Sequence, residues 1–562
     1  MDEENGSKKI WIIGALLVVL ALAAGIWFGR PAYHRYKETR GLKQARAALA
    51  KGDYRNLDLS LRTVLAINPA NLEAVRLMAD LADEARSPAA LVWRRRVAEL
   101  SPTLDDKIIL AACALRYEQA PFALTAQTLE EIRPTAETNT SYHLVASQLA
   151  IKLNRLPDAE THLRAAAVLQ PTNRLHQLNL ATIRLQSGET NTADSARREL
   201  AALAGDPALG EHALRSLVAD GVVHRQFAEA QKFSRQLLAR PQATFDDRLQ
   251  QLTILSGAKS TELGQWVART ESEAATNAIK SALLVSWLTA HDSAREALNW
   301  LASLPATARD TLPIPLVEAD AYVALREWKG LETRLSGQRW KEQEFLRLAL
   351  LSRAFREQGQ RDTANANWRL AVNAATAKPE ALAVLAQVAG SWGWQSEVED
   401  LLWVIVRRSP GAEWALKNLL QGYAAKNDTP GLYRVYQGLL KNHPQAVELK
   451  NNVAMFGLLL NRDRSEAVRL AREVYETGKT NALLVSTHAF ALHTQGKTAE
   501  GLKLMQTLPE PELTRPNIAL YYGILLAAIG EGSTAKPYLD TAEKSPMLPE
   551  ERLLFEQARR GK

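Results

Sequence analysis

The chain has 562 residues, with 69 Lys and Arg against 62 Asp and Glu and a formal net charge of +7. A chain of this length exceeds what one hydrophobic core supports, so it consists of several domains or of a repeat array. Ala, Leu, Arg, Glu and Gln dominate, aromatic residues make up 6%, and alternating Val-Ile-Thr stretches are rare. This composition predicts an all-α protein.

The positive charge is concentrated near the N-terminus. Residues 1–9 carry a net charge of −1 and residues 30–51 carry +6, which leaves +2 for the rest of the chain. A nearly neutral array has no extended face that could follow a phosphate backbone, so we expect no nucleic-acid partner. The basic segment is better explained by proximity to a membrane surface.

An uncharged apolar stretch follows the N-terminal tail of residues 1–9. It runs from Ile10 to Gly29, about the length a helix needs to cross a bilayer, with Trp11 and Trp27 near its ends. We therefore predict a transmembrane helix over residues 10–29 that contacts the lipid bilayer. A cleavable signal peptide is the alternative, but the apolar run continues past the small residues at 21–23, which favours an anchor.

A basic juxtamembrane segment, residues 30–42, comes next. We expect its cationic side chains to contact anionic lipid head groups; they are Arg30, Arg35, Lys37 and Arg40. The positive-inside rule then places the remaining chain in the cytoplasm of a single-pass protein of the bacterial inner membrane. The Lys8-Lys9 pair before the apolar run is the usual form of an exporting signal anchor, so the periplasm stays open as the alternative.

Prolines that follow apolar helical stretches recur at a nearly constant spacing. Their successive spacings are 33, 32, 37, 36 and 34 for the first six and 34 for the last two; the prolines are Pro69, Pro102, Pro134, Pro171, Pro207, Pro241, Pro410 and Pro444. A period of about 34 residues is typical of tetratricopeptide repeats.

The last unit strengthens that interpretation. It resembles the tetratricopeptide repeat family at its aromatic-Gly, turn-Gly and small-residue positions, which are Tyr522-Gly523, Leu526, Gly530, Ala535, Leu539, Ala542 and Pro546. The resemblance implies an α-solenoid of helix-turn-helix units, stacked into a right-handed superhelix whose concave face binds other proteins. It implies no small-molecule substrate.

The resemblance covers residues 40–550 and predicts about a dozen repeats. We expect a first array over 43–305, of which 242–305 is divergent, and a second array over 317–562 that ends in a capping helix. Between them, Pro305, Pro313 and Pro315 break the register, which predicts a soft boundary at 306–316.

No pattern of a catalytic or cofactor site occurs in the sequence. Cys113 is the single cysteine and lies on an apolar stretch, which predicts a buried thiol without a disulfide or metal role. His488 and His493 are five positions apart, off the i,i+4 spacing of a helical metal pair. We therefore expect no enzyme activity, cofactor or metal.

The candidate partner-binding residues are Trp414, Lys417, Gln421 and Asn452. Tryptophan is a favoured interface anchor, and Trp414 stands near the start of a first helix, where it would face the concave groove. Trp368 is expected in the core, and of Trp392 and Trp394 one is expected at the surface.

Repeats that grip a C-terminal carboxylate resemble a Lys-Asn-Asn-Lys-Arg pattern. The same register here supplies Lys417, Gln421, Asn452, Ala482 and Ser486, which match at two of five positions. The two missing basic residues argue against that ligand.

The sequence thus favours a non-catalytic, membrane-anchored scaffold or adaptor that mediates protein–protein interactions. The alternative is a structural subunit of an envelope export, assembly or polysaccharide-secretion machine. Fold alone does not name the partner.

Overall fold

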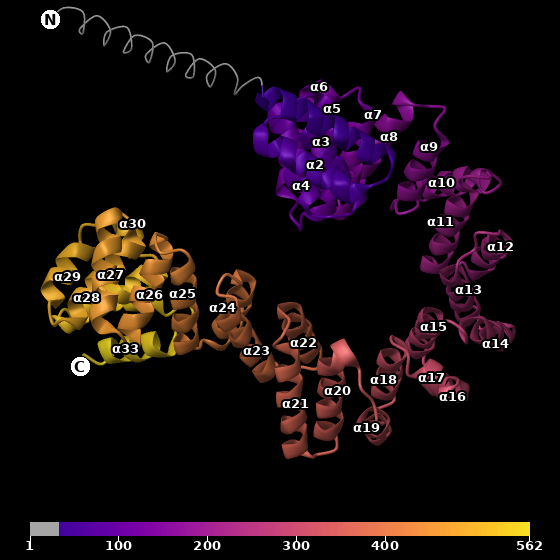
Figure 1. Ribbon diagram of the computed structural model, residues 1–562. Coiled ribbons are helices and arrows are strands. Elements are labelled where there is room, and N and C mark those ends of the chain that lie inside the picture. Colours follow the sequence, from indigo (N-terminus) through magenta and orange to yellow (C-terminus); the bar gives the residue numbers. More distant parts are fainter. Residues whose placement is uncertain (1–32, 562) are drawn as a thin grey trace, which may run out of the picture. The chain divides into compact units, whose positions relative to one another are not determined.

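The computed structural model describes residues 33–561, which form helices joined by short turns and contain no strand (Figure 1). The all-α prediction is confirmed for these residues. The predicted tail and transmembrane helix, and Arg30, lie outside them. In the part of the chain that is described, no helix combines the length and apolarity needed to cross a bilayer.

The helices form two compact units, the first ending at Glu273 and the second beginning at Ala274. In the first unit, seven consecutive antiparallel pairs follow one another. They are residues 33–50 with α2 (Tyr54–Ile67), α3 (Leu72–Glu84) with α4 (Ala89–Leu100), α5 (Leu104–Tyr117) with α6 (Ala123–Ala136), α7 (Thr140–Lys152) with α8 (Leu156–Leu169), α9 (Arg174–Arg184) with α10 (Thr190–Leu203), α11 (Gly210–Val223) with α12 (Phe227–Leu238), and α13 (Phe245–Gly257) with α14 (Leu263–Ala274).

The second unit has eight such pairs and a final single helix, α33 (Pro549–Arg559). The pairs are α15 (Ala278–Ala290) with α16 (Ala294–Ser303), α18 (Ile314–Ala324) with α19 (Trp328–Ser336), α20 (Glu344–Glu357) with α21 (Arg361–Ala375), α22 (Pro379–Ser391) with α23 (Gln395–Arg408), α24 (Glu413–Lys426) with α25 (Thr429–Asn442), α26 (Val447–Leu459) with α27 (Arg464–Thr477), α28 (Ala482–Thr494) with α29 (Thr498–Met505), and α31 (Pro516–Ala528) with α32 (Gly532–Ala542). Three one-turn helices lie between pairs: α17 (Ala306–Arg309), η1 (Lys341–Gln343) and α30 (Glu510–Leu513).

Most pairs turn from the first helix (helix A) to the second (helix B) through one residue in the left-handed region. From Arg225 onward these residues are 33 to 35 positions apart; they are Arg225, Lys259, Asp292, Arg326, Gly359, Gly393, Asn427, Asn461, Gly496 and Gly530. Glycine adopts this backbone freely and other residues at a cost. The predicted period of about 34 residues is therefore confirmed over this stretch.

Two details of the predicted register were wrong. Seven of the eight aligned prolines do lie between pairs, but Pro134 lies inside α6, near its end. The seven and eight pairs also exceed the predicted dozen, because several pairs turn through Lys259, Asp292 or Arg326 instead of glycine and so lack the expected signal.

The stretch 306–316, where the sequence predicts a boundary, lies within the second unit and forms α17 and the start of α18. The turn spacing does not break there, since 34 positions separate Asp292 from Arg326. Helices α16 and α18 share a core cluster that includes Leu298 and Ala321. Pro305 and Pro313 immediately precede α17 and α18, and Pro315 lies in the first turn of α18, where the lack of an N–H costs no helical hydrogen bond.

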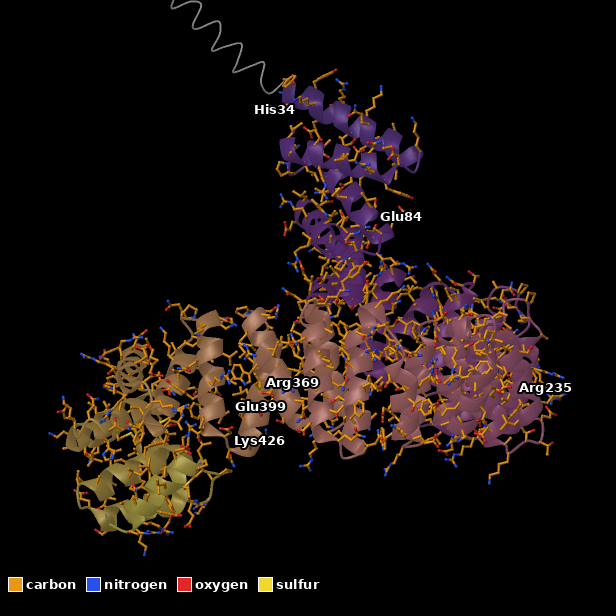
Figure 2. All side chains as sticks on the ribbon, turned by 60° about the horizontal axis from the view of Figure 1, so that its bottom comes forward. His34, Glu84, Arg235, Arg369, Glu399 and Lys426 are labelled. Carbon is orange, nitrogen blue, oxygen red and sulfur yellow. The ribbon has the colours of Figure 1, made fainter. Side chains whose placement is uncertain are left out.

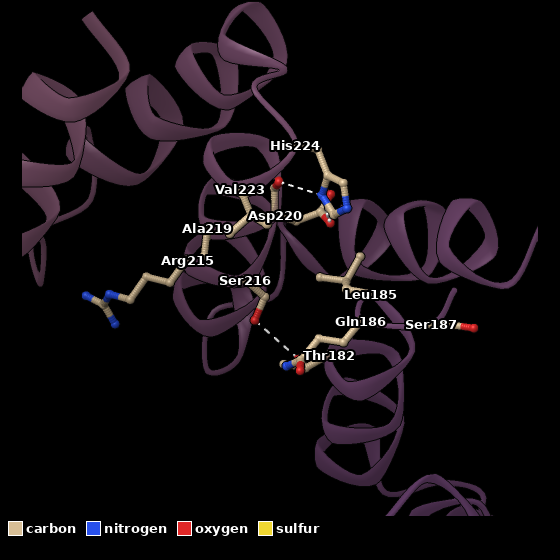
Figure 3. Close-up of a pocket in the computed structure, with 10 residues that line it drawn as sticks. All are labelled: Thr182, Leu185, Gln186, Ser187, Arg215, Ser216, Ala219, Asp220, Val223 and His224. Carbon is tan, nitrogen blue, oxygen red and sulfur yellow. Dashed lines mark hydrogen bonds and ion pairs between the residues drawn. The ribbon is translucent and has the colours of Figure 1, made fainter. Parts of the chain in front are cut away.

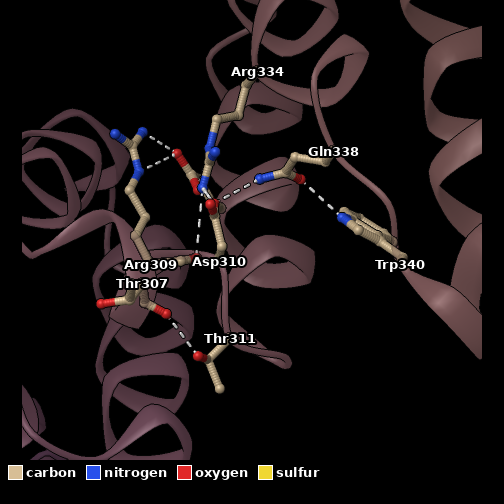
Figure 4. Close-up of polar contacts among 8 residues, drawn as sticks. Thr307, Arg309, Asp310, Thr311, Arg334, Gln338 and Trp340 are labelled. Carbon is tan, nitrogen blue, oxygen red and sulfur yellow. Dashed lines mark hydrogen bonds and ion pairs between the residues drawn. The ribbon is translucent and has the colours of Figure 1, made fainter.

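A buried ionic cluster fastens α17 to the neighbouring pair (Figure 4). Glu318 is fully buried and accepts hydrogen bonds from Nε of Arg309 and Nε of Arg334, each at 2.9 Å. Asp310 accepts from Arg334 at 2.8 Å and from Gln338 at 3.1 Å. The cluster gives the predicted boundary stretch a defined place in the array.

Candidate interaction surface

Four positions on helix A of each pair form a row along one face, which we name the A-helix stripe. These positions lie 13, 10, 9 and 6 residues before the turn residue of the pair. In α24, whose turn residue is Asn427, the stripe consists of Trp414, Lys417, Asn418 and Gln421, and all four are exposed. Asn452 is the corresponding residue nine places before Asn461 in α26, and it is half-buried. The four residues predicted from the sequence therefore share one stripe, while their binding role stays a prediction.

Helix α24 is held in place by its opposite face. Leu416, Leu419 and Tyr423 are buried there. The Tyr423 hydroxyl donates to Glu399 at 2.5 Å and accepts from Nε1 of Trp403 at 2.9 Å. Burial, followed by the hydrogen bond to Glu399, raises the pKa of Tyr423 to about 12, so the hydroxyl keeps its proton at neutral pH.

Three further contacts join α23, α24 and α25. Glu399 also forms an ion pair with Lys426 at 3.1 Å, and both side chains are labelled in Figure 2. Gly431 at the start of α25 lies against the Tyr423 ring, where an added Cβ would come within 2.3 Å of a ring atom. The guanidinium of Arg434 lies 3.6 Å from the centre of the Trp403 ring. Trp414 thus projects from a helix that its neighbours hold firmly.

Among the tryptophans of residues 33–561, Trp414 is the exposed one, with 46% of its surface accessible. Trp394 is buried and Trp392 half-buried, with ring centres 5.0 Å apart in an edge-to-face contact. The expectation that one of this pair reaches the surface was wrong, because Arg353 and Arg356 cover the two rings. Trp368 is half-buried at the edge of Trp394.

The first unit has a groove on the same stripe, which sequence reasoning missed (Figure 3). It has a volume of about 670 Å³ and lies between α9 and α11. Hydroxyls of Thr182 and Ser216 hydrogen-bond across it at 3.2 Å, and Val223 is 75% exposed at its edge. The sequence did not predict this groove for two reasons. Its stripe residues are small or polar and form no recognisable pattern, and the turn between α9 and α10 has no left-handed residue that would mark the register.

Asp220 fixes one wall of this groove. It is nearly buried and accepts from Nε of Arg197, a residue of α10, at 2.6 Å. Its backbone carbonyl also contacts Nδ1 of His224 at 3.0 Å. The bidentate pairing of Arg215 with Asp247 of α13, at 2.9 Å for both bonds, holds the other end of the helix.

The single cysteine and the two histidines singled out from the sequence serve packing. Cys113 is 4% exposed, and burial raises the pKa of its thiol to about 11, so it is a poor nucleophile at neutral pH. The His488 ring stacks on Tyr475, and Nδ1 of His493 contacts the hydroxyl of Thr498 at 3.0 Å. Across residues 33–561, no group of three or more potential metal ligands comes together.

Three of the predicted lipid-contacting residues lie in the described helix over 33–50. Arg35, Lys37 and Arg40 are all exposed. The Lys37 ammonium lies 4.7 Å from the centre of the Tyr33 ring, and Tyr33 is 56% exposed. This end of the first pair therefore presents basic and aromatic side chains together.

No protein-family model matches the chain, and no curated protein matches its sequence. Among solved structures, a chain in the "Crystal structure of APC/C hetero-tetramer Cut9-Hcn1" matches with 13% sequence identity and a TM-score of 0.27, over 83% of this chain and 99% of that one. Similarity at this level carries no argument about function. The structure by itself shows a helical-repeat protein whose pairs of helices recur about every 34 residues.

Proposed function

We propose that the chain is a non-catalytic scaffold that binds protein segments along its A-helix stripe. Trp414 is the main support for this proposal. It is the exposed tryptophan among the described residues, and it lies on the same stripe as Lys417 and Gln421. Tryptophan is enriched among the residues that contribute most of the energy of a protein–protein interface. In repeat arrays, such a surface accommodates an extended or helical segment of the partner.

We further propose that the scaffold is tethered to the bacterial inner membrane by residues 10–29. Support comes from the uncharged stretch itself and from the exposed basic residues that follow it. Tethering raises the effective concentration of the array at the bilayer. Charge asymmetry supports a cytoplasmic array, with the periplasm as the alternative.

Co-purification of the full chain from its native membranes tests the scaffold proposal. We expect the double variant Trp414→Ala, Lys417→Ala to recover at least ten-fold less partner than the wild type. Leu370→Ala is the matched control, because Leu370 is 53% exposed on a helix B. Equal recovery by all three proteins would contradict the proposal. Partners recovered in fixed stoichiometry would identify a structural subunit of an envelope machine instead of a client-binding adaptor.

A further inference from the structure

From α24 onward, the stripe positions 10, 9 and 6 places before the turn become progressively buried toward the C-terminus. They are exposed in α24 and half-buried in α26. In α28 the positions 10, 9 and 6 before Gly496 are Ser486, Thr487 and Phe490, with exposures of 2%, 1% and 2%. In α31 the same positions before Gly530 are Leu520, Tyr521 and Ile524, with exposures of 2%, 4% and 5%. The positions 13 places before the two turns, Leu483 and Asn517, stay exposed, so the burial concerns the other three positions.

The covering element is α33. Its inward residue Phe555 is 2% exposed and belongs to the same apolar cluster as Phe490 and Tyr521, against which Leu554 and Ala558 also pack. The Tyr521 hydroxyl, on the stripe, donates to Glu551 at 2.6 Å. The spacing of Leu554, Phe555 and Ala558 is the apolar face of an amphipathic helix.

Helix α33 also reaches a pair that lies well before the end of the array. The hydroxyl of Thr429, at the start of α25, donates to Glu550 of α33. Leu548, just before α33, packs against the cluster that contains Leu416 and Leu432. Helix α33 packs mainly on α31 and α32, as a cap of the last pair would. Its N-terminal end also reaches the pair α24–α25, and Figure 1 shows α33 in yellow below α25 and α26.

The rest of α33 has few ties to the array. Its outer face includes Arg552 and Leu553, and Leu553 is 57% exposed. Its ion pairs from Arg559 to Asp540 and Glu543 join side chains that are 40% to 47% exposed, and such pairs contribute little in water. An 11-residue helix is too short to be stable alone. Packing against the array is therefore needed to keep α33 folded.

We propose that the apolar surface under α33, which includes Phe490 of α28 and Tyr521 of α31 and is here called the groove, is a docking site for a short amphipathic helix of a partner protein. Helix α33 is the chain's own occupant, and the partner helix displaces it. The contacts of α33 define the partner's chemistry: apolar residues at i, i+1 and i+4, preceded by two carboxylates in the first turn that accept from Tyr521 and Thr429. This inference deepens the proposed scaffold function and rests on it.

The test uses the full chain and a fluorescent peptide of residues 544–562 as the probe. In the wild type the tethered helix competes with the peptide. The apparent affinity for the peptide is therefore the intrinsic affinity multiplied by the fraction of molecules in which the groove is open. Phe555→Asp in the chain ejects α33, and we expect it to bind the peptide at least ten-fold more tightly than the wild type does. Leu553→Asp adds the same charge to the outer face and should leave the affinity at the wild-type value.

Two further variants keep the test decisive. Tyr521→Phe in the Phe555→Asp chain removes the donor to Glu551 and should weaken peptide binding several-fold. Leu554→Ala is a milder opening variant should Phe555→Asp fail to fold. A folded Phe555→Asp chain that binds no peptide would overturn the proposal. Loss of hydrogen-exchange protection throughout α31 and α32 in both opening variants would also overturn it, since α33 would then be a structural cap. Co-purification with the Trp414→Ala, Lys417→Ala variant tests the scaffold function separately, because it measures partner recovery and not peptide affinity.

Discussion

The buried cluster around Glu318 allows a quantitative prediction of how strongly residues 306–316 are held to the neighbouring helices. Glu318→Gln keeps the shape of the side chain and removes its charge. Arg309 and Arg334 then face a neutral amide, although their side chains are only 21% and 18% exposed. Breaking a fully buried pair costs about 3–5 kcal/mol, and partial solvent access to the two arginines reduces this to about 2–3 kcal/mol.

Native-state hydrogen exchange is the suitable assay, because a repeat array opens locally and has no single unfolding transition. At about 1.4 kcal/mol per factor of ten, we expect exchange in α17, α18 and α19 to accelerate roughly 30- to 150-fold. Asp310→Asn is the control: Asp310 is 55% exposed, so its loss should cost less than about 1 kcal/mol. Exchange in α24 and α25 should not change.

An acceleration below about three-fold in Glu318→Gln, or equal effects of both variants, would refute this reasoning. The cluster would then be dispensable, and the stretch 306–316 would be a loosely attached connector. A strong effect confined to α17, α18 and α19 would show that this stretch is an integral part of the second unit.

Four other predictions concern single groups or the whole chain. Trp403→Ala empties a buried site and should destabilise its pair by about 3–5 kcal/mol, measured by local hydrogen exchange, whereas Trp414→Ala should cost less than about 1 kcal/mol. Comparable losses would contradict the assignment of Trp403 to the core and of Trp414 to the surface. Native Cys113 should react with a maleimide at pH 7.5 at least about 100-fold more slowly than the unfolded chain, since its thiol has a pKa of about 11 and is buried. Burial alone would raise the pKa of Asp247, but hydrogen bonds from Arg215 and Thr244 outweigh it and lower that pKa. The stabilisation by Asp247 is therefore present above about pH 4 and is lost as the pH falls through the lower folded-state pKa. In that acidic range amides at the start of α13 should exchange faster in the wild type, and Asp247→Asn should not show this pH dependence. In intact spheroplasts an added protease should spare a cytoplasmic array and degrade a periplasmic one.

The repeat architecture could be predicted because its signals are local. Prolines between pairs and glycines at turns, such as Gly393 and Gly530, recur with the period itself. Where Lys259, Asp292 and Arg326 occupy the same left-handed position, the sequence carries no such mark. Packing of the neighbouring helices holds those residues in a backbone region that costs roughly 1 kcal/mol, so the register through 242–345 is evident in the structure alone.

The candidate surface could be predicted in part. Trp414, Lys417, Gln421 and Asn452 could be placed together because positions on successive first helices repeat with the period. A capping helix at the C-terminus was also expected. Its contact with Thr429 was not, because the two residues of that hydrogen bond are 121 positions apart. Such a contact follows from how four pairs stack, and no local pattern encodes it.

Site-specific photocrosslinking in native membranes tests whether the A-helix stripe is the surface that binds the partner. A photoreactive amino acid placed at position 414 of the full chain should form a protein adduct, and the same group at position 370, on an exposed helix B, should not. Adducts at position 414 that disappear when Lys417 and Gln421 are both replaced by Ala would support the A-helix stripe as the binding surface. Equal adducts at both positions, or adducts at position 370 alone, would show that the A-helix stripe is not the surface that binds the partner.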